Sequence, residues 1–127
     1  NKQVTMWGTG SAMREFLHID DIADASVFLM QNYSGDPGEP ANTPGMSWIN
    51  IGSGTDLTMK ELGQKIAKTV GFEGEIVYDH IHPDGTPRKL LDSSKLFSLG
   101  WRPSISLEEG LLSTYEDYKL NKDNYRR

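Results

Sequence analysis

Two groups of basic residues in this sequence have the chemistry needed to hold an anion. Arg14 follows a glycine-containing turn that also presents Trp7, and Arg88 and Lys89 follow residues 83–87, whose proline and glycine content predicts a tight turn. Arginine offers a planar fork of donors that suits phosphate, lysine offers a point charge, and the face of a tryptophan can pack on a base or a sugar. Together these residues predict a site for a ligand that carries a diphosphate.

A purely structural interpretation of the same residues stays open. Arg14 has acidic neighbours in Glu15, Asp20 and Asp21 with which it could form ion pairs, while Arg88 and Lys89 could simply be solvated. Exposed ion pairs of this kind are common on protein surfaces and contribute little to stability. The choice between the two interpretations depends on where the side chains point.

Two glycine-rich segments resemble cofactor-binding turns but lack a required residue. Residues 52–54 (Gly-Ser-Gly) lie between an expected strand and an expected helix, but Leu57 stands where the third glycine of a dinucleotide-binding turn belongs. Residues 8–10 (Gly-Thr-Gly) fail in the same way, because Met13 takes the third position. We therefore expect neither segment to bind NADP.

The histidines and tyrosines do not form a complete catalytic group. Residues 79–82 (Asp-His-Ile-His) bring two imidazoles together, but a spacing of two residues on a loop favours a solvated turn over a metal site. His18 is expected at the start of a helix, hydrogen-bonded to its cap. The Tyr-x-x-x-Lys match from Tyr118 to Lys122 falls where Tyr118 should be buried. We assign no catalytic residue and no metal ligand.

Composition narrows the class of protein. A chain of 127 residues has the usual length of one domain, and an apolar share of 36% provides material for a modest core. The net charge of -5, with scattered basic residues, argues against nucleic-acid binding. The absence of cysteine is compatible with the cytoplasm, where we expect the protein, and the sequence has no apolar run of membrane-spanning length.

The order of elements favours an α/β fold with a small mixed sheet and helices, because strand and helix periodicities alternate along the chain. Strands are expected at 3–7, 48–51 and 75–78, and residues 14–17 read as extended. Residues 34–45 hold three prolines and three glycines and predict a surface loop.

Two capping boxes fix the starts of helices. Thr58 with Glu61, and Ser106 with Glu109, have the spacing at which a hydroxyl and a carboxylate satisfy each other's backbone N–H groups. Gly71 should end the first of these helices, because glycine tolerates the left-handed conformation common after a helix.

Two further helices are expected. One should run from Asp20 or Asp21, which would cap it, to about Asn32, and a short one should run over 93–99 and end at Gly100. The first and last helices should each present a stripe to the core, formed by Ile22, Ala25, Ser26, Leu29 and Tyr33 in the first and by Leu107, Leu111, Tyr115 and Tyr118 in the last.

Two segments carry a resemblance to a known family. Residues 7–21 read W-G-T-G-S-A-M-R-E-F-L-H-I-D-D and are similar to the W-G-x-G-x-x-x-R-E-F-L-H-[VI]-D-D segment of GDP-L-fucose synthases, with a shorter core shared by other extended short-chain dehydrogenases. Residues 83–92 read P-D-G-T-P-R-K-L-L-D and are similar to a signature of the same synthases. Residues 99–101 and 105–111 also fall where that family has them.

The resemblance implies roles for particular residues. Trp7 and Arg14 match residues that contact the GDP-sugar, Asp84 matches a substrate-contacting aspartate, and Lys89 matches a basic residue near the diphosphate. Arg88 is a weaker candidate. The family enzyme, expected to be a homodimer, is an NADP-dependent epimerase and reductase that converts GDP-4-keto-6-deoxy-D-mannose to GDP-L-fucose.

The resemblance also implies what this chain lacks. In the family, the cofactor loop and the catalytic residues lie upstream of the segment that matches Trp7. In this chain, Asn1 leads directly into an expected strand, as at an excised end. Residues 1–127 would then be the C-terminal, substrate-binding region of an extended short-chain dehydrogenase/reductase without its Rossmann domain. We expect NADP(H) to bind to that missing domain, residues around 20–51 to pack on it, and the isolated chain to catalyse nothing.

Two alternatives stay open from the sequence. The chain could belong to another GDP- or UDP-sugar epimerase or dehydratase, or it could be a free-standing binding or interaction module whose basic residues serve a protein partner.

Overall fold

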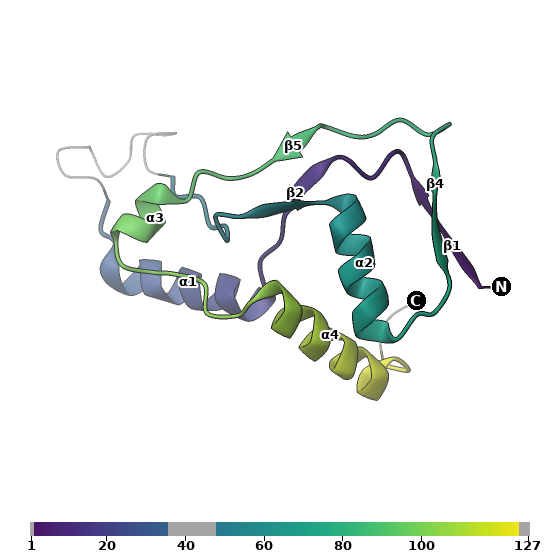
Figure 1. Ribbon diagram of the computed structural model, residues 1–127. Coiled ribbons are helices and arrows are strands. Elements are labelled where there is room, and N and C mark those ends of the chain that lie inside the picture. Colours follow the sequence, from purple (N-terminus) through teal and green to yellow (C-terminus); the bar gives the residue numbers. More distant parts are fainter. Residues whose placement is uncertain (1, 36–47, 125–127) are drawn as a thin grey trace.

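The computed structural model describes residues 2–35 and 48–124, and within them it has two small sheets and four helices (Figure 1). This arrangement confirms the predicted α/β class. None of the described helices combines the length and apolarity needed to cross a bilayer. In chain order the elements are β1 (Gln3–Trp7), β2 (Met13–Glu15), α1 (Ile19–Asn32), β3 (Asp56–Thr58), α2 (Met59–Val70), β4 (Glu75–Asp79), β5 (Arg88–Lys89), α3 (Ser94–Ser98) and α4 (Leu107–Asn121).

The two sheets share a feature that matters for the site. β1 pairs with β4 in parallel, and β2 pairs in parallel with β5 on one side and antiparallel with β3 on the other. The stretch from β1 to β2 therefore runs alongside the stretch from β4 to β5 in the same direction, as the ribbon across the upper part of Figure 1 shows. Residues far apart in sequence meet in order along this pair.

The predicted helix caps of α2 and α4 are confirmed. Thr58 and Glu61 form a complete capping box at the start of α2, and Ser106 and Glu109 form another at the start of α4. Gly71 ends α2 with a φ of 68°, the left-handed conformation that glycine adopts without steric cost. These contacts involve residues close in sequence, so local chemistry is sufficient to specify them.

The core lies between α1 and α3. Ala25, Leu96 and Trp101 are buried together, and the indole Nε1 of Trp101 donates to Asp24 Oδ2 at 2.8 Å. Partly buried side chains surround this centre: Leu17, Phe28, Leu29, Ile49, Ile51 and Phe97. Because the core is at one end of the molecule, the strands at the other end depend on hydrogen bonds and small contacts.

The predicted start of α1 is wrong. His18 is the N-cap, with Nδ1 accepting from the backbone N–H of Asp20 at 3.2 Å. Asp21, which is 2% exposed, instead accepts hydrogen bonds from Ser104, through its N–H and its hydroxyl, and from the N–H of Ile105. Burial alone would raise the pKa of Asp21, but these bonds outweigh it and lower the pKa. Asp21 thus attaches the segment before α4 to α1.

Three other sequence predictions are wrong, at places where long-range packing determines the local structure. Residues 48–51 are irregular, because Ile49 and Ile51 pack onto the core without a strand partner. Tyr118, predicted to be buried in the stripe of α4, is 54% exposed, and Ile22 of the α1 stripe is also exposed. The tight turn predicted over 83–87 is absent, and the chain turns earlier, at 80–81. The predicted loop over 34–45 lies from residue 36 onward outside the described residues.

Candidate functional site

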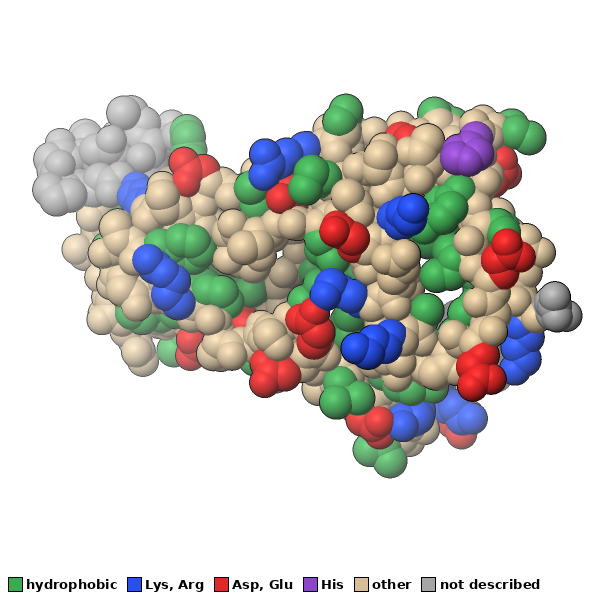
Figure 2. All heavy atoms as spheres, viewed as in Figure 1, with side chains coloured by type: hydrophobic (Ala, Val, Ile, Leu, Met, Phe, Trp, Pro, Cys, Tyr) green, Lys and Arg blue, Asp and Glu red, His purple; other side chains and the backbone are tan. Residues whose placement is uncertain are grey.

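The two segments that carry the basic residues lie side by side, and we call residues 7–15 and 82–91 the paired segments. Contacts follow one another in order along them: Trp7 with His82, Thr9 with Asp84, Met13 with Pro87, and Glu15 with Leu91. Figure 2 shows basic side chains over β5 and a histidine at the end of β4, on the same upper edge of the molecule. The tertiary structure therefore assembles the predicted residues from both segments on one edge.

Arg14 and Lys89 point to the same face of the three-stranded sheet. They are direct partners in the parallel β2–β5 register, and partners in a register share a face because side chains alternate along each strand. Lys89 is exposed, and its ammonium group makes no hydrogen bond or ion pair with the described residues. The two cations that the sequence predicted to act together are thus neighbours.

The guanidinium of Arg14 is held by carbonyl groups. Its Nη1 donates to the carbonyls of Met13 and Thr86, each at 2.6 Å. None of the described residues takes its Nε or Nη2, and none of Glu15, Asp20 and Asp21 pairs with it. Because neutral carbonyls orient this group without cancelling its charge, Arg14 can still bind an anion.

Arg88 has a different environment. By the same alternation it lies on the opposite face from Lys89, where its Nε donates to Asp56 Oδ2 at 2.6 Å and its Nη2 to Oδ1 at 3.2 Å. The hydrogen bond from Arg88 lowers the pKa of Asp56, and the carboxylate in turn raises the pKa of Arg88. This pair connects β5 to β3 across β2.

Asp84 attaches its segment to the glycine-containing turn. Its Oδ1 accepts from the N–H of Thr9 at 2.9 Å and its Oδ2 from the Thr9 hydroxyl at 2.6 Å. Gly8 makes this approach possible, because a Cβ there would lie 2.3 Å from Oδ1. The bonds from the Thr9 side chain and backbone lower the pKa of Asp84, so their stabilising effect is complete above the ordinary aspartate pKa and is lost as pH falls through the lowered value.

Trp7 stacks on a residue that the sequence left as part of a solvated turn. The indole and the His82 imidazole lie nearly parallel, with centroids 4.4 Å apart and planes 5° apart. Nδ1 of His82 is 2.9 Å from Asp79 Oδ2, while Asp79 Oδ1 accepts from the N–H of Ile81. Trp7 is nonetheless 73% exposed. Among the described residues, no group of three His, Asp or Glu side chains forms a metal site.

The glycines at 52–54 surround a carboxylate from the same chain. Glu15 accepts from the N–H of Gly54 at 2.7 Å and from the Ser53 hydroxyl at 3.3 Å, and a Cβ on Gly52 would lie 2.6 Å from its Oε1. Glu15 also accepts from the N–H of Leu91 at 3.1 Å. Because Glu15 takes the donor that a dinucleotide phosphate would need, this turn does not fit NADP. Sequence reasoning missed Glu15, although its adjacency to Arg14 in a matched motif was a signal.

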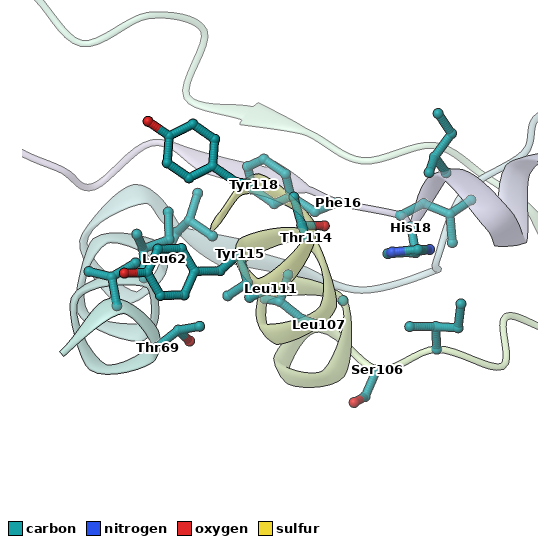
Figure 3. A pocket seen from close by; sticks show the side chains of 16 residues that line it. Phe16, His18, Leu62, Thr69, Ser106, Leu107, Leu111, Thr114, Tyr115 and Tyr118 are labelled. Atoms are coloured by element: carbon teal, nitrogen blue, oxygen red, sulfur yellow. The ribbon is translucent and has the colours of Figure 1, made fainter. Parts of the chain in front are cut away.

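A hollow lies elsewhere, between α2 and α4, and we call it the α2–α4 groove. It has a volume of about 630 Å³, and Figure 3 shows Leu62 from α2 and Tyr115 from α4 lying between the two helices. Its other labelled lining includes Phe16, His18, Thr69, Ser106, Leu107, Leu111, Thr114 and Tyr118. A second, smaller hollow adjoins the start of α4. Neither of these two hollows is lined by a predicted site residue.

Known proteins resemble this chain over nearly all of its length. Residues 1–44 match the NAD dependent epimerase/dehydratase family. The chain is 54% identical over 119 residues to the putative GDP-L-fucose synthase 2 of Arabidopsis thaliana, covering 94% of this chain and 33% of the relative. It is 50% identical over 123 residues to the GDP-L-fucose synthase of Escherichia coli K12, covering 97% of this chain and 38% of the relative.

A solved structure agrees with the sequence comparisons. A GDP-mannoheptose C4 reductase from Campylobacter jejuni with NADP bound superposes with a TM-score of 0.77 at 41% identity, covering 93% of this chain and 35% of the reductase. The resemblance to GDP-L-fucose synthases is thereby confirmed, and the chain spans about a third of the length of the relatives it matches.

Proposed function

We propose that this chain is the C-terminal, GDP-sugar-binding part of a GDP-L-fucose synthase, an oxidoreductase and isomerase that converts GDP-4-keto-6-deoxy-D-mannose to GDP-L-fucose with NADPH. The observation that carries the proposal is the pairing of two motif segments, which brings Arg14 and Lys89 to one face of a sheet. Identities of 50% and 54% to GDP-L-fucose synthases support the choice of enzyme.

The diphosphate is the part of the substrate for which these residues are suited. Arg14 keeps Nε and Nη2 available while Nη1 is fixed by two carbonyls, so its charge is oriented before a ligand arrives. Lys89 adds a second positive charge from the adjacent strand. A planar fork and a neighbouring ammonium group can contact oxygens on both phosphates.

Trp7 and Asp84 complete the proposed contact set. The exposed indole offers a flat surface to a base or sugar ring. Asp84 keeps the glycine turn in place through Thr9, and its carboxylate lies at the exposed edge where it can also accept from a sugar hydroxyl. Arg88 connects β5 to β3 through Asp56 and makes no part of our contact set, because that pairing takes two of its donors.

NADP(H) is proposed to bind outside this chain. The relative from Campylobacter jejuni carries NADP in a protein about three times as long as the matched part. In this chain the turn at 52–54 holds Glu15, so these residues contribute no cofactor contact. The cofactor supplies the hydride when bound, and the present residues hold and orient the sugar nucleotide.

The exposed side of α1 is proposed to pack on the cofactor domain. Ile19 and Met30 are 73% and 77% exposed, and Ile22 and Val27 on the same helix are also exposed, as is Trp48. Apolar side chains gathered on one helix normally lie against another part of the protein. We propose that the complete enzyme is a homodimer, as the resemblance implies, and that it is cytoplasmic, with which the absence of cysteine in this chain is compatible.

The test is activity of the full-length protein. It should oxidise NADPH in the presence of GDP-4-keto-6-deoxy-D-mannose and form GDP-L-fucose, and GDP should compete with the substrate while UDP should not. A preference for UDP-sugars, or inactivity of a folded protein that binds NADPH, would overturn the proposal. Turnover of a GDP-heptose in preference to the deoxymannose substrate would instead favour a reductase of the Campylobacter jejuni type.

A further inference from the structure

We propose that His82 is a positioning residue that holds the indole of Trp7 in the orientation needed by the nucleotide sugar. The role rests on the proposed function, because it requires that Trp7 contacts the ligand. His82 itself belongs to neither matched motif segment, since it directly precedes residues 83–92.

The geometry restrains the indole from one side only. The imidazole lies 4.4 Å from it and within 5° of parallel, which covers one ring face, while 73% exposure of Trp7 leaves the other face open. An exposed tryptophan at the end of a strand would otherwise sample several rotamers, and fixing them on binding costs affinity. A stacked partner already present in the protein removes part of that cost.

The side chain of His82 is in turn held by the side chain of Asp79. Asp79 is the register partner of Trp7 across β1 and β4, and its backbone carbonyl accepts from the N–H of Gly8 at 2.9 Å. Its side chain accepts from Ile81 N–H and lies 2.9 Å from His82 Nδ1. The bond from Ile81, assisted by His82, lowers the pKa of Asp79, so this carboxylate is ionised at neutral pH. One aspartate therefore fixes both the turn and the imidazole plane.

The stack also makes the indole a reporter on His82. The imidazole shields one face of the indole from water, so the emission of Trp7 should change when that ring is removed.

The experiment tests the stacking in the full-length protein. Trp7 emission is obtained by subtracting the Trp7→Phe variant, and GDP-L-fucose affinity is measured by calorimetry. His82→Ala should weaken binding about 2- to 10-fold, the range expected for one aromatic pair, and His82→Phe should restore binding to within about 2-fold because a flat ring still stacks. The emission of Trp7 should shift in His82→Ala and stay unchanged in the control His80→Gln.

Two results would overturn the positioning role. One is a Trp7 emission that does not change in His82→Ala, and the other is unchanged affinity in His82→Ala while Trp7→Ala weakens binding. If Trp7→Ala itself leaves affinity unchanged, the proposed ligand contact fails, and with it the need for a positioning residue. Circular dichroism of each variant distinguishes these outcomes from loss of the fold.

Discussion

The paired segments and the α2–α4 groove differ in what they offer a ligand: the paired segments carry cations, and the groove is an apolar hollow. The groove is a large hollow with mainly apolar side chains, and none of the predicted site residues lines it. The paired segments instead carry an oriented guanidinium, an ammonium group and an exposed indole. The apolar hollow and the groups suited to bind an anion therefore lie on different parts of this molecule.

The difference teaches how to choose between the two surfaces. A nucleotide diphosphate is strongly hydrated, so an apolar hollow cannot repay the loss of water around its charges, whereas fixed cations can. Volume alone would have selected the groove. The contacts that orient Arg14 and leave it uncancelled select the paired segments instead.

The test with the largest expected effect compares GDP binding by Arg14→Ala, a variant of the paired segments, with GDP binding by Leu111→Ala, a variant of the groove. Arg14→Ala should weaken GDP affinity about 10- to 100-fold, the range for hydrogen bonds from a charged group, with calorimetry as the measurement. Leu111→Ala removes packing from the groove and should lower the thermal midpoint without changing GDP affinity. A groove variant that weakens GDP binding as much as Arg14→Ala would reverse the choice of surface.

A second test concerns the turn on which the paired segments depend. Gly8→Ala places a Cβ 2.3 Å from Asp84 Oδ1 at a φ of 80°, so it should lower the free energy of unfolding by about 1–3 kcal/mol and weaken the contact to Thr9. Gly71→Ala is the matched control, because its φ is 68° and nothing lies within 4 Å of the new Cβ. Chemical denaturation of both measures the difference. Equal losses would show that Asp84 does not press on Gly8 in solution.

The smallest expected effect distinguishes two adjacent cations on opposite faces. Lys89→Ala should weaken GDP affinity about 3- to 10-fold, because it removes a positive charge beside Arg14, whereas Arg88→Ala should change it less than about 2-fold. Repeating the titrations at high salt should narrow the gap, since exposed charges are screened. A larger loss for Arg88→Ala would place the ligand on the other face.

Part of the fold could be predicted because its causes are local. The capping boxes at Thr58 and Ser106 need only residues three positions apart, and both are present. The cap of α1 was mispredicted because Asp21 is drawn to the distant Ser104 and Ile105, which leaves His18 to cap the helix. Residues 48–51 have strand-forming composition, yet packing on the core took precedence over pairing.

The candidate site shows the same division. Residue type and motif were enough to select Trp7, Arg14, Asp84 and Lys89 as candidates, and their roles in binding remain predictions. The sequence could not show that His82 stacks on Trp7, because 75 residues separate them and their contact depends on the parallel register of β1 with β4.

By itself the sequence determined the starts of α2 and α4 set by capping boxes, the α/β class and the candidate residues for anion binding, because these follow from side-chain chemistry and short-range spacing. Only the tertiary structure decided which of two adjacent cations stands beside Arg14. Lys89 shares a face with Arg14 and Arg88 pairs with Asp56 because strand register assigns alternate residues to opposite faces, and a register is a property of two strands together.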